Sequence, residues 1–169
     1  MAALPLLSLR SPAPAALLVA LGSGAALAAA WFFQLVVGLA PCPLCLDQRI
    51  PYYMALPLGL VTLAVLAAGK LRTGRVLLAL LAVMMLGNFA LAVFHAGVEW
   101  RFWAGPTSCT GAPVMVTGDI LSAIKGANVP RCDEAAWRLF GLSMAGWNAI
   151  VTAALALIAG RAAATGRTL

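Results

Sequence analysis

The chain has 169 residues, of which 63% are hydrophobic and only 9% are charged. A soluble domain carries about 25% charged residues, so this composition indicates a membrane protein. The formal net charge is +6. Because the basic residues form no dense patch with interleaved aromatic residues, we expect no nucleic acid as a partner.

Four long apolar segments predict four membrane-spanning helices within a single domain, residues 1–169. The spans are expected at about 13–39, 51–68, 76–95 and 142–159. Each is close to the ~20 residues that cross a bilayer. They must be helices, because an open sheet edge in lipid would leave backbone groups unpaired. The predicted fold class is an all-α integral membrane protein, a four-transmembrane-helix bundle.

The beginning of the first segment has a feature of cleaved signal peptides. Arg10 precedes an Ala/Leu-rich stretch that ends in three small residues, 28–30. The apolar run nevertheless continues through Trp31 to Val37. A run of that length favours a complete span over the short hydrophobic region of a signal peptide.

Charge is distributed unequally between the two ends of the spans. One side carries six basic and no acidic residues: Arg10, Lys70, Arg72, Arg75, Arg161 and Arg167. The other side carries five basic and five acidic residues: Arg49, Arg101, Lys125, Arg131, Arg138, Asp47, Glu99, Asp119, Asp133 and Glu134. Five minus five is zero, so the whole +6 lies on the first side. The positive-inside rule predicts that this side, with both termini, is cytoplasmic.

With this orientation a short outer loop lies at about 40–50, a long outer loop at about 96–141 and a cytoplasmic loop at about 69–75. Within the long loop, apolar residues recur at helical spacing over 116–127. This spacing predicts a short amphipathic helix on the membrane surface. An irregular loop that covers the bundle is the alternative.

All four cysteines lie in the outer loops, which suits an oxidising compartment. Among the three possible connectivities, the geometry of the loops favours Cys42–Cys45 with Cys109–Cys132. A disulfide that closes the short Cys42–Cys45 loop is a weak staple, whereas Cys-x-x-Cys pairs are typical of redox-active dithiols. Two inert disulfides or a four-cysteine zinc site are the alternatives. Because a second Cys-x-x-Cys is lacking, we expect no metal.

Two polar residues near the Cys-x-x-Cys pair are further candidates. On a helix, Arg49 would share the face of Cys45 and stabilise its thiolate, or hold the oxygen of an electron acceptor. A helix that starts only at Pro51, or an arginine that anchors in lipid headgroups, is the alternative. His95 is expected at the same interface, as a packing residue or as a group that exchanges a proton near the acceptor. Three amides within the spans are expected to make helix–helix hydrogen bonds: Gln34, Asn88 and Asn148.

The motif Cys42-Pro43-Leu44-Cys45 with Arg49, followed by the distant pair Cys109 and Cys132, resembles the disulfide bond formation protein B (DsbB) family. The resemblance covers essentially the whole chain. Four further segments look like those of α-proteobacterial-type members: 99–103, 106–110, 130–133 and 140–144.

The resemblance implies a protein-disulfide:quinone oxidoreductase of the bacterial inner membrane, with its redox loops in the periplasm. Such an enzyme reoxidises a periplasmic DsbA-like thioredoxin-fold protein and passes the electrons to a membrane quinone, either ubiquinone or menaquinone. By resemblance, the partner attacks Cys109, with Cys132 as its companion, and the electrons move to Cys42 and Cys45. Cys45 would engage the quinone beside Arg49. His95 is a further candidate for quinone binding.

One position departs from the family pattern. Gln48 stands where the best-known members have an acidic residue before the arginine, while Asp47 lies one residue earlier. This departure concerns only the residues next to Arg49, because the spacing of the cysteines matches the family. Two other functions stay open at this point: a specialised paralogue that serves one dedicated partner, and a four-span structural or transport subunit with two inert disulfides. The latter lacks the charged residue deep within a span that transport pathways usually have.

Overall fold

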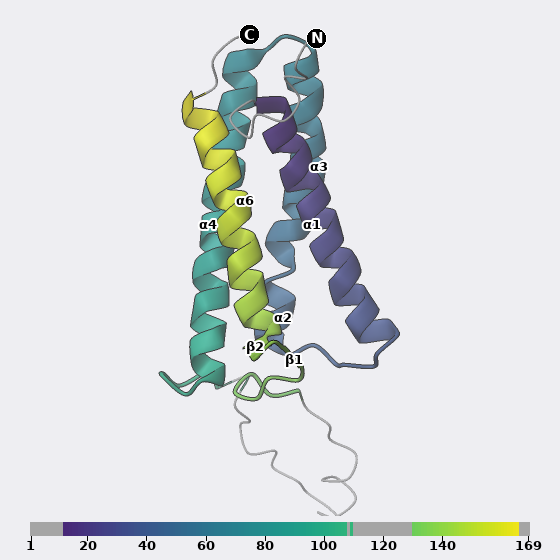
Figure 1. Ribbon diagram of the computed structural model, residues 1–169, viewed down its shortest axis with the longest axis vertical. Helices are drawn as coiled ribbons and strands as arrows, with labels where there is room; N and C mark the ends of the chain where they lie inside the picture. Colours follow the sequence, from purple (N-terminus) through teal and green to yellow (C-terminus); the bar gives the residue numbers. More distant parts are fainter. Residues whose placement is uncertain (1–11, 108, 110–129, 166–169) are drawn as a thin grey trace, which may run out of the picture.

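The computed structural model describes residues 12–107, 109 and 130–165. In these residues four helical segments are long and apolar enough to cross a membrane, which confirms the predicted four-helix membrane bundle (Figure 1). The helices are α1 (Pro12–Leu35), the short α2 (Pro43–Asp47) continued by α3 (Ile50–Ala67), α4 (Leu71–Glu99) and α6 (Met144–Thr165).

The helix boundaries differ from the predicted spans. Helix α1 ends at Leu35, before residue 39, and α6 runs from Met144 to Thr165, where the predicted span was 142–159. Helix α4 begins before residue 76 and continues beyond residue 95, so that Glu99 belongs to the helix and not to the long loop. Helix α2 lies within the segment predicted as the short loop. In α4 and α2 the helical backbone extends past the apolar segment into polar residues, where hydropathy no longer marks it.

The packing of the bundle is closest between neighbouring pairs. Helix α4 packs most extensively against α6, and α1 packs against α3. Small residues of α1 make the second contact possible: at Gly59 of α3, an added Cβ would lie 3.0 Å from the Ala20 Cβ and 3.3 Å from the Ala16 carbonyl oxygen. Close approach at small residues is the usual way in which membrane helices associate, because lipid provides no hydrophobic driving force between them.

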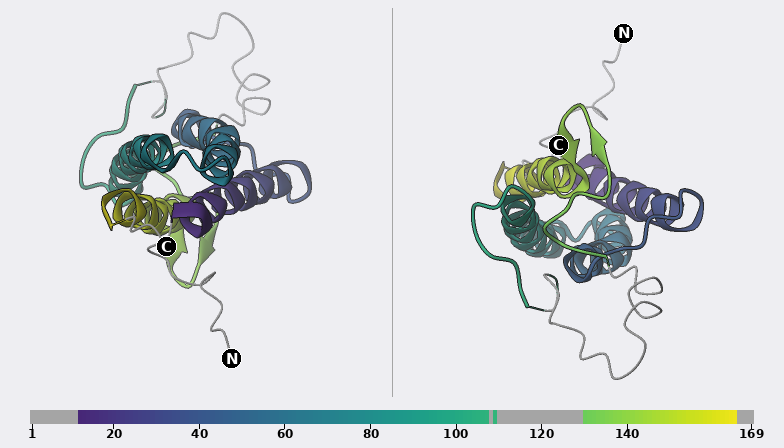
Figure 2. Two further views of the ribbon diagram at one scale, coloured as in Figure 1. Left: turned by 90° about the horizontal axis from the view of Figure 1, so that it is seen from above. Right: turned by 90° about the horizontal axis from the view of Figure 1, so that it is seen from below.

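Helices α1 and α6 pack against each other less extensively than either pair. Viewed along the bundle, α1 is inclined away from the other three long helices (Figure 2). It diverges from α6 towards the end of the bundle that holds α2 (Figure 1). Residues of both helices line a cavity at that end.

A short β-hairpin, with two residues in each strand and two in the turn, leads the chain into α6. The sequence did not predict it. Strand β1 (Arg138–Leu139) pairs in antiparallel fashion with β2 (Leu142–Ser143). The two turn residues, Phe140 and Gly141, have φ of 51° and 82°. Positive φ at both central positions matches the twist of a hairpin, and glycine adopts it without strain. The predicted surface helix, 116–127, lies outside the described residues.

The basic residues lie where the charge pattern predicts, at the end of the bundle away from α2. Lys70 and Arg72 flank the α3–α4 connection, and Arg75 lies one turn further along α4. The Arg75 guanidinium donates to the carbonyl oxygens of Ala163 at 2.8 Å and of Ala164 at 3.1 Å. A cation there stabilises the carbonyl end of α6 and its dipole. Arg10 and Arg167 lie outside the described residues.

Candidate active site

Cys109 and Cys132 form a disulfide, with their Cα atoms 5.1 Å apart. This is one of the two pairings that the loop geometry favoured, and the other, Cys42–Cys45, is not closed in this structure. Both residues are buried, and they form a hydrophobic cluster with Cys42, Leu44 and Val98. The second cysteine pair therefore does not lie on a separate loop but packs directly on the first.

Cys42 and Cys45 are free thiols at the start of α2. Cys42 is the N-cap residue, and its Sγ accepts a hydrogen bond from the Cys45 backbone N–H at 3.3 Å. Pro43 follows at the first helical position, which suits proline because its missing N–H would have no partner there. Thus a short helix begins at Pro43, before the alternative start at Pro51. The two sulfurs lie 2.6 Å apart.

The Cys42 thiol is strongly influenced by its neighbour. The hydrogen bond with the Cys45 side chain, together with burial, holds the pKa of Cys42 above its usual range. Cys42 is therefore a weaker acid than an ordinary thiol while the pair is reduced.

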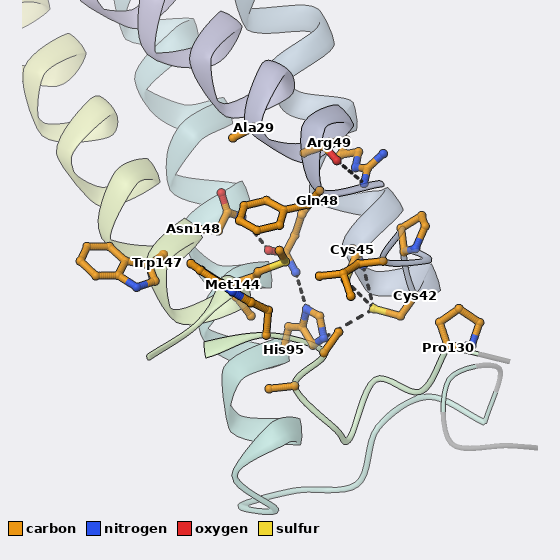
Figure 3. A pocket seen from close by; sticks show the side chains of 18 of the residues that line it. Ala29, Cys42, Cys45, Gln48, Arg49, His95, Pro130, Met144, Trp147 and Asn148 are labelled. Carbon is orange, nitrogen blue, oxygen red and sulfur yellow. Dashed lines mark hydrogen bonds between the residues drawn. The ribbon is translucent and has the colours of Figure 1, made fainter. Parts of the chain in front are cut away.

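His95 of α4 connects the two cysteine pairs. Its Nε2 lies 3.7 Å from Cys42 Sγ, and Figure 3 shows the ring between Cys42 and Gln48. The sulfurs of Cys42 and Cys132 and a ring nitrogen of His95 all lie within 4.8 Å of one another, and all three residues are buried. The ring also makes a hydrogen bond with the backbone of Cys132. The arrangement thus brings both pairs within reach of one imidazole.

A chain of buried hydrogen bonds holds His95 from the other side. Its Nδ1 is 2.7 Å from Gln48 Nε2, and Gln48 Oε1 accepts from Asn148 Nδ2 at 2.6 Å. The chain ends where the Tyr52 hydroxyl donates to Asn148 Oδ1 at 2.5 Å. Asn88 donates to the Gln48 backbone carbonyl at 3.1 Å. Residues from three helices therefore fix the orientation of the imidazole.

Glu99 lies one helical turn after His95 and faces the same site. One of its carboxylate oxygens is 3.9 Å from His95 Nε2, and its side chain is only 5% exposed. Sequence reasoning missed this residue, because it was counted only as a charge of the long loop. The i, i+4 spacing from His95 was the signal that could have found it.

Arg49 points away from the cysteines towards α1. Its Nη1 donates to Gln34 Oε1 at 2.6 Å and its Nη2 to the Ala30 carbonyl at 3.4 Å. The guanidinium carbon lies 5.7 Å from the centre of the Trp31 ring, within the range of a cation–π contact. The arginine is therefore held in place by protein groups, which disfavours an arginine that only anchors in headgroups.

A cavity of about 600 Å³ opens beside these residues. Its apolar and small wall residues come from α1 and α6, such as Ala26, Phe33 and Val151, and from the connecting segments, such as Leu39 and Trp137. The side chains of the site that line it are Cys42, Cys45, Gln48, Arg49, Tyr52, His95, Glu99 and Asn148. A mostly apolar pocket of this size with a few convergent polar groups is typical of a small-molecule or cofactor site.

Four of the six predicted site residues line the cavity, Cys42, Cys45, Arg49 and His95. Cys132 lies against Cys42 and His95. Cys109 joins them through its disulfide. Gln48 and Asn148 were not predicted as site residues, but they hold the imidazole in place. A buried amide looks the same in the sequence whether it joins helices or orients a functional ring.

Together, the fold and the site define a multi-pass membrane protein with a dithiol–disulfide centre. A family model for "Disulfide bond formation protein DsbB" matches residues 12–162. Two relatives named Disulfide bond formation protein B match at 34% identity over 136 residues (Marinobacter nauticus) and 32% over 137 residues (Hahella chejuensis). These matches cover 73% and 72% of this chain, and 75% and 74% of the relatives.

A third relative of the same name, from Stutzerimonas stutzeri, is 26% identical over 160 residues, which cover 89% of this chain and 93% of the relative. No solved structure matches the chain significantly. The chain belongs to the DsbB family of membrane proteins of disulfide bond formation. The resemblance inferred from the motifs is therefore confirmed.

Proposed function

We propose that the protein oxidises the dithiol of a periplasmic DsbA-like thioredoxin-fold partner and passes the two electrons to a membrane quinone. One observation carries this proposal. The Cys42 and Cys132 sulfurs, which belong to different pairs, lie within 4.8 Å of each other, and Cys42 lines a cavity to which α1 and α6 contribute. Inert disulfides would need neither the proximity nor the cavity.

The first half of the reaction is thiol–disulfide exchange within the cysteine cluster. The partner thiolate attacks Cys109, the Cys109–Cys132 bond breaks, and Cys132 leaves as a thiolate. Cys132 then attacks Cys42 in a Cys42–Cys45 disulfide and releases Cys45 as a thiolate. The attack in this direction is supported by the position of Cys42, which is the sulfur of its pair that faces Cys132. Each step needs a thiolate attacker and a good leaving thiol.

The second half of the reaction restores the Cys109–Cys132 disulfide. The partner's other thiolate attacks the partner sulfur of the mixed disulfide and releases Cys109. Cys109 then attacks Cys132, and Cys42 leaves with the electron pair of the bond between Cys42 and Cys132. His95 Nε2, 3.7 Å from the Cys42 sulfur, is placed to exchange a proton with it. The partner ends as a disulfide, and Cys42 and Cys45 carry the two electrons.

The cavity fits a quinone ring. Its volume of about 600 Å³ lies within the ~300–1,000 Å³ of small-molecule sites, and its mostly apolar walls suit a quinone ring. When bound, a quinone accepts two electrons and two protons. Cys45 and Arg49 would hold it, the first as the less buried of the two thiols that line the cavity and the second as a fixed cation for a ring oxygen. His95 lines the same cavity, but both of its ring nitrogens already face protein groups.

The location is part of the proposal. We place the protein in the bacterial inner membrane, with the cysteine end of the bundle in the periplasm. The basic end, with Lys70, Arg72, Arg75 and Arg161, supports a cytoplasmic location of that end by the positive-inside rule. The oxidising periplasm also suits the Cys109–Cys132 disulfide.

Disulfide exchange between the two pairs can be tested with variants that retain only one cysteine of each pair. The double variant Cys45→Ser/Cys109→Ser keeps Cys42 and Cys132, and mild oxidation with diamide should join them in a disulfide that mass spectrometry detects. The matched control, Cys42→Ser/Cys109→Ser, keeps Cys45 and Cys132 and should form its disulfide more slowly. Equal rates in the two variants, or no disulfide in the first, would contradict the proposed route.

A further inference from the structure

Four potential metal ligands converge at the junction of the two cysteine pairs. The ligand atoms of Cys42, His95 and Cys132 lie within 4.8 Å of one another, and all three residues are buried. The sulfur of Cys45 lies 2.6 Å from that of Cys42. The sequence spacing hid this set, because the histidine comes from α4 and Cys132 from a distant segment.

One edge of this set already matches that of a tetrahedral zinc site. With Zn–S of about 2.3 Å and Zn–N of about 2.0–2.1 Å, the edge between a sulfur and a nitrogen is about 3.5 Å. The Cys42 Sγ to His95 Nε2 distance is 3.7 Å. The hydrogen bond from the Cys45 N–H to the Cys42 sulfur stabilises negative charge on that sulfur. Rotation of the partly exposed Cys45 side chain would separate the two thiols of α2 to the edge of a tetrahedron, about 3.8 Å.

The surroundings of His95 suit a metal ligand as well. A zinc-bound imidazole binds through one nitrogen and donates its other N–H to an oxygen. Gln48 faces Nδ1 with an amide, and an amide presents either its oxygen or its nitrogen after a half-turn. Asn148 and the Tyr52 hydroxyl can reverse their hydrogen bonds in the same way. The buried chain therefore satisfies either tautomer of the imidazole.

A buried carboxyl group lies next to the site. Glu99 lies 3.9 Å from His95 Nε2, and in the described part of the chain its second oxygen, Oε2, is buried without a hydrogen-bond partner. A buried carboxylate oxygen without a partner is costly, which favours the neutral acid form of Glu99 beside a site whose Zn²⁺ and three thiolates carry a net charge of −1. The cavity reaches Cys42, Cys45, His95 and Glu99 and supplies a route for an ion.

We infer that the fully reduced protein binds one Zn²⁺ ion through Cys42, Cys45, Cys132 and His95. In the structure Cys132 is paired with Cys109, so the site exists only after reduction. A dithiol reductant gives two electrons and two protons to the Cys109–Cys132 bond and becomes a disulfide itself. Zn²⁺ then replaces the protons of three thiols, which are released to solvent. Cys109 becomes a free thiol outside the metal site.

A bound zinc ion would stop disulfide exchange. The exchange proposed above needs Cys132 as an attacking thiolate and Cys42 as its target. In the zinc-bound state both sulfurs are metal ligands and neither forms a disulfide. The reduced protein would thus be held in an inactive form until the metal is removed. This inference does not depend on the quinone or the thioredoxin-fold partner, because any dithiol creates the reduced state.

The test is a metal titration of the full chain in detergent micelles. The protein is reduced under anaerobic conditions, the reductant is removed, and Co²⁺ is added as a spectroscopic probe before displacement by Zn²⁺. We expect one equivalent of Co²⁺ with thiolate charge-transfer bands and the intense visible bands of a tetrahedral ion. The oxidised protein should show neither. The inference would be overturned if the reduced protein showed no tetrahedral Co²⁺ spectrum. It would also be overturned if the oxidised protein showed a spectrum of the same intensity.

Two cysteine variants form a matched pair for this titration. Cys109→Ser removes a thiol outside the site and should retain the spectrum and the zinc affinity. Cys132→Ser removes a ligand and should weaken zinc binding by more than the ~10- to 100-fold caused by loss of a group that only hydrogen-bonds to a ligand. His95→Gln should weaken binding similarly, which guards against a folding defect in one variant. Wild-type affinity in both Cys132→Ser and His95→Gln would refute the ligand set. Neither quinone nor partner is present, so the result is separate from the test of the proposed function.

Discussion

The position of Arg49 depends on a residue of another helix, and Gln34→Leu tests this dependence. The substitution removes the oxygen that accepts from Arg49 Nη1 at 2.6 Å but leaves the arginine and its charge in place. A hydrogen bond with a charged donor contributes about 1.5–3 kcal/mol. If that energy holds the guanidinium in its place beside the quinone, its loss raises the quinone KM by ~10- to ~150-fold, since 1.4 kcal/mol is tenfold. The weaker contact with the Ala30 carbonyl, at 3.4 Å, makes the lower end of this range the expected one.

The assay is the initial rate of quinone reduction by the purified protein, followed by quinone absorbance, with a reduced thioredoxin-fold protein as electron donor. The KM for the donor should not change, because Gln34 is far from Cys109 along the electron path. Ser23→Ala is the matched control, because Ser23 is a buried polar residue of the same helix whose hydroxyl has no hydrogen-bond partner in the described residues. An unchanged quinone KM in Gln34→Leu, or an equal rise in Ser23→Ala, would refute the reasoning.

Three further predictions concern the cysteines. Cys42→Ser or Cys45→Ser should leave the protein folded, as judged by thermal unfolding in detergent, but stop quinone reduction; full activity in either variant would contradict a redox role of the pair. Cys109→Ser should abolish the trapped mixed disulfide with a thioredoxin-fold partner on non-reducing gels, whereas persistent trapping through Cys132 would reverse the assignment of the attacked cysteine. The raised pKa of Cys42 means that less of it is thiolate at a given pH. In the reduced protein its alkylation rate, located by mass spectrometry, should therefore keep rising with pH beyond the usual thiol pKa of ~8.5, and a plateau near that value would show an ordinary thiol.

The main features of the fold could be predicted from the sequence because lipid leaves few alternatives. A long apolar segment in a bilayer must be a helix, and the imbalance of Lys70, Arg72 and Arg75 against no acidic residue marks one end of the bundle. The ends of the helices were less predictable. Hydropathy falls at Glu99, but the hydrogen-bonded backbone of α4 continues to that residue. The hairpin depends on only two turn residues, Phe140 and Gly141, and so is too short for a periodic pattern.

The cysteines of the site were predictable, but the groups around them were not. Cysteine has few roles in an outer loop, so four of them limit the chemistry to disulfides, redox exchange or metal binding. Gln48, Asn148 and Glu99 belong to residue types with many roles, and only the packing of α3, α4 and α6 shows that they face His95. Likewise, the distance between Cys42 and Cys132 depends on how a distant segment folds back over α4.

The central claim is that electrons pass from a protein dithiol through both cysteine pairs to a quinone. The most direct measurement is anaerobic mixing of the oxidised protein with a reduced thioredoxin-fold partner and either ubiquinone or menaquinone, while quinone absorbance and partner thiols are followed together. The wild-type protein should reduce one quinone for every partner dithiol oxidised, and the Cys45→Ser variant should reduce none. Oxidation of the partner without loss of quinone absorbance, or no reaction with either quinone, would contradict the central claim.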